Sequence, residues 1–153
     1  AFVGDSLFHQ QRHVLFQNQT SSSWLFWVKS PEVEAPTSGA LLVLSLFVAR
    51  DQEYLRLSSP ILSLPAQGVD PALYQRLLEL NAEMVCAALA TVSLEVHVVA
   101  VRPVGNAGPQ ELEDLLVRVA GYANLFKGQL SEEFGIPVWE LAAVAEGSDE
   151  GIE

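Results

Sequence analysis

The side chains in this sequence that could support chemistry are few and scattered. His9 and His13 are four residues apart, so on a helix they would share one face and could hold a metal ion between them. No glutamate or third ligand accompanies the pair, which favours surface histidines over a metal site. A metal-dependent hydrolase built on these two residues is therefore the least favoured hypothesis.

The remaining candidates also favour structural roles. His97 lies in a predicted strand without a Ser or Cys nucleophile in a readable partnership with it, so we expect a partly exposed or locally hydrogen-bonded side chain. The acids within 111–114 and 132–133 solvate helix faces, and those near a helix start complement its dipole. The GNAG stretch at 105–108 precedes a helix, whose free N–H groups favour an anion, but it lacks nucleotide-binding spacing. The sequence predicts no catalytic residue, no metal and no cofactor.

Charge and length bound the class of protein. Eight Lys and Arg against nineteen Asp and Glu give a net charge of −11, which opposes direct binding to nucleic acid. Half of the 153 residues are apolar, as expected for a packed globular chain with the length of one domain. We therefore expect one domain over residues 1–145 and a solvated, flexible acidic tail over 146–153, where the sequence is EGSDEGIE.

Cysteine content and hydropathy indicate the compartment. Cys86 is the single cysteine, so no disulfide forms within the chain, and its apolar neighbours predict a small buried side chain. The absence of a cysteine framework favours a reducing compartment. No apolar run reaches the roughly 18 to 20 residues that a membrane-spanning helix needs. We expect a soluble cytoplasmic protein without membrane association.

Hydrophobic periodicity predicts the strands. The segment 5–17 is expected to hold a short helix running into a strand, and Pro60 and Pro65 are expected to bracket an irregular segment. Residues 40–50 and 53–59 are expected to form an antiparallel hairpin. The predicted strands are 23–30, 40–50, 53–59, 85–91 and 93–102, and the short stretch 138–145 is left open as helix or strand.

A first helix is predicted over 70–84. Asp70 suits its N-cap and Pro71 its first helical position. Asn81 is interpreted as a polar end-cap of this helix. An apolar face is expected from Leu73, Leu77, Leu80 and Met84, with Leu78 widening it.

A second, long helix is predicted over 109–134. Pro109 begins it, and Gly135 followed by Pro137 ends it. Gly121 and Gly128 are seven residues apart on one side, where a small residue would admit a neighbouring backbone. A sustained apolar seam is expected from Leu112, Leu116, Val119, Ala123, Phe126 and Leu130.

These elements predict an α+β fold with a mostly antiparallel sheet flanked by helices. The seam of the long helix and the strand with Trp24 and Trp27 offer more apolar surface than one thin sheet readily covers, so we expect subunits to pair. Aromatic anchors dominate interface energetics. The predicted protein-interaction or dimer-interface residues are Trp24, Trp27, Tyr54, Tyr122 and Phe126.

The stretch from Leu57 to Gly135 resembles the YbjN-like proteins, which share the type III secretion chaperone-like fold. The resemblance is carried by LLELN at the end of a helix, a β-pair, a Pro-containing loop and the ELEDLL…VAGYANLFKGQL helix. It implies a non-enzymatic, chaperone- or adaptor-like homodimer with a stress or DNA-damage association. A single-stranded-DNA-binding protein of the damage response is the client it suggests. The alternative is a small-ligand or anion-sensing regulatory domain, using the 105–109 loop and a pocket beneath the long helix.

Overall fold

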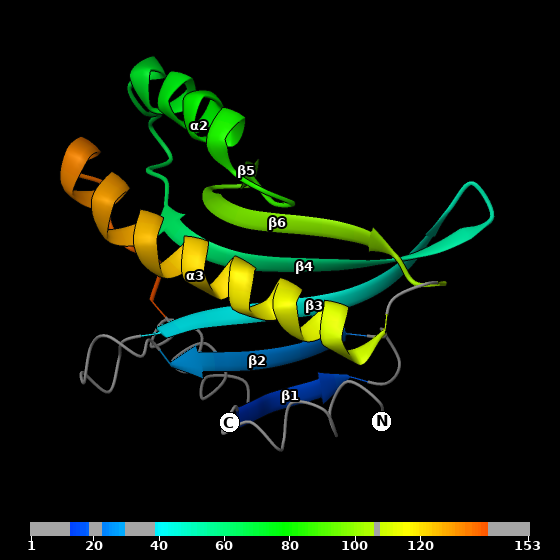
Figure 1. The fold of residues 1–153 in the computed structure, drawn as a ribbon. Helices are drawn as coiled ribbons and strands as arrows, with labels where there is room; N and C mark the ends of the chain where they lie inside the picture. The colour runs from blue at the N-terminus through cyan, green and yellow to red at the C-terminus, as the bar shows by residue number, and fades with distance from the viewer. Residues whose placement is uncertain (1–12, 19–22, 30–38, 106–107, 141–153) are drawn as a thin grey trace.

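One antiparallel sheet with two helices makes up the described part of the protein (Figure 1). The computed structural model describes residues 13–18, 23–29, 39–105 and 108–140. The strand order in the sheet is β1-β2-β3-β4-β6-β5, and every neighbouring pair is antiparallel. The elements are β1 (His13–Asn18), β2 (Ser23–Lys29), β3 (Gly39–Ala49), β4 (Gln52–Ser63), α2 (Pro71–Glu83), β5 (Ala88–Val92), β6 (Glu95–Pro103) and α3 (Pro109–Phe134). The predicted α+β class is confirmed.

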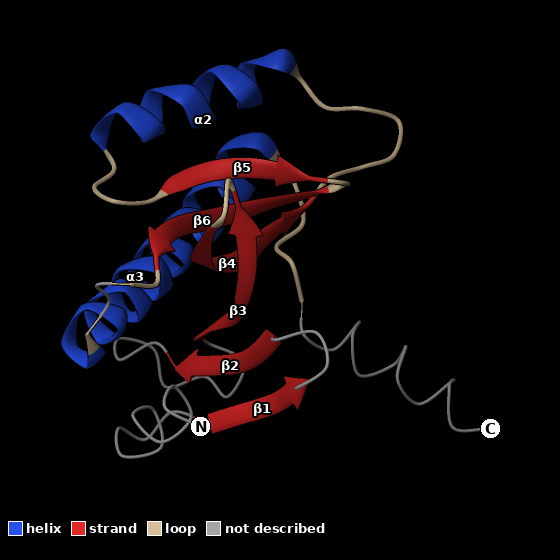
Figure 2. Cartoon of the chain, turned by 90° about the vertical axis from the view of Figure 1, so that its right-hand side faces the viewer, coloured by secondary structure: helices blue, strands red, loops and turns tan. Residues whose placement is uncertain are grey.

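Both helices lie on the same face of the sheet, which we call the helix face (Figure 2). α3 crosses the central strands β3, β4 and β6, while α2 packs against the edge strand β5. All six residues of the predicted seam of α3 are buried. They meet alternate residues of the strands, such as Phe26, Leu42, Leu57 and Val98, which are almost completely buried. Because side chains alternate along a strand, the remaining side chains of the strands lie on the opposite face of the sheet, which we call the open face.

The predicted β3–β4 hairpin is confirmed. Its turn is formed by Arg50 and Asp51, which both have positive φ, at 51° and 63°. Two such residues give the turn a backbone twist that matches the right-handed twist of the two strands. Neither is glycine, which is why the turn lacks the usual sequence signal.

The irregular segment predicted from Pro60 onward is wrong for its first four residues, since β4 continues to Ser63. A register shift between Pro60 and Leu62 places the proline at a bulge, where its missing N–H interrupts no regular ladder. Past the last residue of β4 that pairs with β3, the chain that follows α3 lies beside β4 and continues the sheet. Val138 bridges Leu62, and backbone bonds of 3.0 Å join Ser63 N–H to the Pro137 carbonyl and Trp139 N–H to the Ile61 carbonyl.

The start of α2 follows the prediction, but the width of its buried face does not. Asp70 caps the helix, because its Oδ1 accepts a 3.0 Å bond from Ala72 N–H. Leu73, Leu77 and Leu80 are buried, as expected. Leu78, expected to widen that face, is 70% exposed. α2 lies over the edge of the sheet, so only a narrow stripe of its surface is covered.

Two other predictions near the sheet edge are wrong in detail. Cys86, expected to be buried in a strand, is exposed in the bend between α2 and β5, with φ at 59°. β6 begins at Glu95, because Ser93 and Leu94 form the turn from β5. Of the segment 5–17, residues 13–18 contribute strand β1, and the helix expected before it lies outside the described residues.

In the described part of the chain, neither helix is long and apolar enough to cross a bilayer.

Candidate protein-interaction surface

The five aromatic residues predicted to contact partners do not form one surface. Trp24 pairs in register with Leu44, lies on the helix face and packs against the core. Trp27 and Tyr54 lie on the open face, at opposite ends of β3. Their partners on β3, Leu41 and Phe47, are six residues apart, which corresponds to about 20 Å along a strand.

The two aromatic residues of α3 serve the subunit itself. Phe126 is 6% exposed and belongs to the core, so it is not available to a partner. Tyr122 is half-buried and stacks on Phe126 with ring centroids 5.6 Å apart. The Tyr122 hydroxyl accepts a 2.9 Å bond from Val85 N–H, which ties α3 to the chain after α2. Nearer the start of α2, Arg76 Nε lies 3.5 Å from Glu133 Oε2, so the two helices run antiparallel side by side.

Asn81 joins α2 to the sheet edge rather than capping the helix. Its Oδ1 accepts a 2.6 Å bond from Leu89 N–H, and its Nδ2 donates a 3.2 Å bond to the Leu89 carbonyl. The predicted end-cap role is therefore wrong: the helix end is closed by Met84 N–H donating to the Leu80 carbonyl. The Asn81 amide takes the place of a neighbouring strand for Leu89, and it shields part of the β5 edge.

An apolar stripe lies on the same side of α2 as Asn81. Tyr74 and Leu78 precede Asn81 by seven and three residues, which places the three on one side of the helix, beside β5. Tyr74 is 45% exposed, and Leu78 is the most exposed large hydrophobic residue of the described chain. β5 itself, with the sequence ALATV, carries no charge. We call Tyr74 and Leu78 the α2 edge stripe.

A second uncovered surface runs along α3, on the side away from the sheet. It contains Val117 and Leu125, both more than half exposed, and the exposed glycines Gly121 and Gly128. A Cβ built on either glycine would meet no described atom within 4 Å. The neighbouring backbone expected at these glycines is therefore absent from the described part of this subunit.

Replacing Gly121 or Gly128 by alanine is expected to raise the free energy of unfolding by about 0.5 to 1 kcal/mol each, because glycine is a poor helix former and both sites have room. Urea unfolding followed by circular dichroism measures this. Gly135→Ala is the matched control, since φ at Gly135 is 65° and the substitution should destabilise. If the alanine variants of Gly121 and Gly128 are less stable than the wild-type chain, our conclusion that this side of α3 is uncovered is wrong.

The polar residues considered for chemistry take structural positions. His97 is locally hydrogen-bonded, as expected, with Nε2 3.2 Å from Glu95 Oε1. His13 lies in a strand, so the helical spacing that motivated a metal site with His9 does not apply to it, and His9 lies outside the described residues. Within the described residues, no group of three or more His, Cys, Asp or Glu side chains is placed to hold a metal ion. Lys127 donates to the Gly39 carbonyl, and burial lowers the pKa of Lys127.

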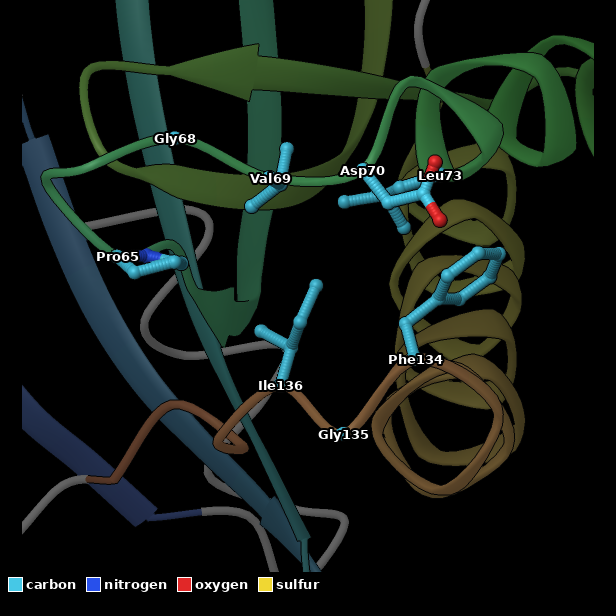
Figure 3. A pocket seen from close by; sticks show the side chains of 8 residues that line it. All are labelled: Pro65, Gly68, Val69, Asp70, Leu73, Phe134, Gly135 and Ile136. Atoms are coloured by element: carbon cyan, nitrogen blue, oxygen red, sulfur yellow. The ribbon is translucent and has the colours of Figure 1, made fainter.

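The alternative ligand site lies partly outside the described residues. Of the 105–109 loop, residues 106 and 107 lie outside the described residues, and Gly108 is the N-cap of α3. A half-open hollow of 210 Å³ lies at the other end of α3, next to Phe134 (Figure 3). A helix of 26 residues is about 39 Å long, so the loop and the hollow form two separate places.

Comparison of the sequence with protein-family models gave no match, and comparison with curated proteins gave none either. The YbjN-like resemblance and the type III secretion chaperone-like fold stay predictions. The fold and the surfaces define an antiparallel α+β protein with an uncovered apolar stripe at its sheet edge.

Proposed function

We propose that the protein is a non-enzymatic homodimer of chaperone or adaptor type that binds other proteins. The observation that carries this proposal is the α2 edge stripe, which leaves Tyr74 and Leu78 in solvent beside an uncharged edge strand. Exposed apolar side chains grouped on one element mark protein-interaction sites more often than isolated ones do. The helix, two strands and long helix over 71–134 correspond to the segments that carry the YbjN-like resemblance.

The stripe suits pairing between two copies through their helices. In a two-fold dimer the same patch meets itself, so a short apolar stripe on one helix lies against its copy. Continuation of the sheet from β5 to β5 is less favourable, because the Leu89 N–H and carbonyl already bond to Asn81. The dimer axis in this proposal therefore passes near Leu78, with the two α2 helices in contact.

The client in this proposal is a polypeptide and not a nucleic acid. The net charge of −11 opposes binding to phosphates, whereas the open face presents Trp27 at one end and Tyr54 at the other. Tyr54 stacks on Phe47, with ring centroids 5.6 Å apart, and the Arg56 guanidinium lies 4.8 Å from the centroid of the same Phe47 ring. The resemblance suggests a cytoplasmic, stress-associated role with a single-stranded-DNA-binding protein of the damage response as client.

Light scattering coupled to size exclusion tests the dimer. The wild-type chain is expected near twice 16.6 kDa, and Leu78→Glu is expected to weaken dimerisation by about 100-fold or more, because it places an unpaired charge in the apolar contact. Leu125→Glu makes the same change on the outer face of α3 and serves as the matched control.

A wild-type chain that stays monomeric at high concentration would disprove the homodimer. If Leu125→Glu dissociates the dimer and Leu78→Glu does not, the dimer interface lies on α3. The anion-sensing alternative receives no support from the hollow, whose lining includes the carboxylate of Asp70 and no basic side chain.

A further inference from the structure

The hollow at the end of α3 combines an apolar base with an acidic rim (Figure 3). Leu73 and Ile136 are buried and form its base, and Val69 and Phe134 are half-buried along its sides. Asp70 is exposed and lies on the same side as Leu73 and the Phe134 ring. At 210 Å³ the hollow has room for one long side chain but not for a nucleotide or other large metabolite, given the roughly 300 Å³ or more of ordinary ligand pockets.

The one polar side chain that lines the hollow, Asp70, is a hydrogen-bond acceptor. Asp70 Oδ1 is used by Ala72 N–H, and the other carboxylate oxygen has no hydrogen-bond partner among the described residues. The hollow also adjoins the C-terminal end of α3, where the last carbonyls of a helix carry partial negative charge. In the last turn of α3, the Ser131 carbonyl accepts a hydrogen bond from Gly135 N–H.

The N-terminal end of α2 offsets part of the charge of its cap, Asp70, but it does not offset the acidic charge at the end of α3. No basic residue occupies the last turn of α3, which instead contains Glu132 and Glu133. Arg76 offsets Glu133, at 3.5 Å, while Glu132 and the C-terminal end of α3 remain. A cation is therefore the charge that this place favours, and an anion is disfavoured.

We infer that the hollow receives a lysine side chain of a partner polypeptide. The aliphatic stem of lysine packs on Leu73, Phe134 and Ile136, and the ammonium group donates to the free oxygen of Asp70 and towards the end of α3. The inference rests on the proposed protein-binding function and names a chemical feature of the client.

Lysine suits this set better than arginine does. The planar guanidinium group of arginine binds best to a carboxylate with both oxygens available, and one oxygen of Asp70 is already used by the helix cap. An ammonium group has three donors around one atom and matches single acceptors from different directions. The preference for lysine distinguishes this inference from general attraction of bases by an acidic protein.

The test is an NMR titration of the full chain with a blocked Ala-Ala-Lys-Ala-Ala peptide. Saturable shifts are expected at the amides of Val69, Leu73 and Ile136. Peptides with norleucine or arginine in place of lysine are expected to bind at least about fivefold more weakly. Asp70→Asn keeps a good N-cap residue and removes the charge, so it is expected to weaken lysine-peptide binding by about fivefold without unfolding α2. Circular dichroism of the variant confirms that the helix is retained.

The outcomes separate this inference from the proposed function. Equal binding of the norleucine peptide, or unchanged binding to Asp70→Asn, would overturn the lysine site, as would absence of saturable shifts at the hollow. A dimer by light scattering with no lysine binding would remove this inference alone. A monomer that binds the lysine peptide would instead disprove the homodimer and leave the lysine site in place.

Discussion

Gly39→Ala is expected to lower the free energy of unfolding by about 3 kcal/mol. Gly39 begins β3 with φ at 150°, a conformation that residues with a Cβ rarely adopt. A Cβ there would lie 2.6 Å from the Val28 carbonyl oxygen and 2.9 Å from the Trp27 ring. Since the first contact is with backbone, no rotation of a side chain relieves it. Urea unfolding monitored by tryptophan fluorescence measures the loss.

Gly68→Ala is the matched control for this substitution. Gly68 also has positive φ, at 103°, but a Cβ there would meet no described atom within 4 Å. The loss of stability in Gly68→Ala therefore measures backbone strain alone, without a steric clash. If Gly39→Ala costs no more than Gly68→Ala, the close approach of β2 to Gly39 does not contribute to stability as we argue.

Asn81→Ala is expected to lower the free energy of unfolding by about 2 to 3 kcal/mol, because it leaves both the N–H and the carbonyl of Leu89 without a partner in a half-buried place. The same change opens the β5 edge, so the variant is expected to associate through that strand at high concentration. Hydrogen exchange at the Leu89 amide, together with denaturant unfolding, measures both effects.

Gln75→Ala is a suitable comparison on the same helix. Its side chain makes a 3.1 Å bond to Glu79 on the exposed surface, where such pairs contribute about 0.5 kcal/mol or less. A loss at Asn81 no larger than at Gln75 would mean that water replaces the Asn81 amide at Leu89. The importance that we assign to the edge contact would then be wrong.

Local signals explain why the two helices were predictable. Asp70 with Pro71 begins α2, and Gly135 ends α3 with φ at 65°, and each acts through its own backbone geometry. The seam of α3 has the period of a helix, so its burial follows from spacing alone once a sheet is present.

Other features depend on contacts that no local pattern encodes. Leu78 has the right spacing for a buried face, yet it is exposed because α2 lies over the sheet edge. Cys86 is in an apolar run, but the start of β5 at Ala88 leaves it in a bend. Pro60 reads as a strand breaker, and only the bulge against β6 allows the strand to continue.

The residues predicted for protein contacts differ from those of the surface that we propose. Aromatic residues were chosen because they anchor interfaces, but burial divides them: Phe126 belongs to the core and Tyr122 holds Val85. The α2 edge stripe was missed because Tyr74 and Leu78 look like members of an ordinary amphipathic helix. The one available signal was that apolar residues of this helix extend beyond a single narrow face.

The pairing of residues 137–139 with the end of β4 bears on how the chain folds during synthesis. β4 is made early, but its last residues obtain these partners only when the segment after α3 has left the ribosome. Until then, the backbone groups of Ile61 and Ser63 on that side stay hydrated or pair transiently with other strands. A nascent chain stalled before Pro137 should therefore depend more on ribosome-associated folding factors than one stalled after Glu140.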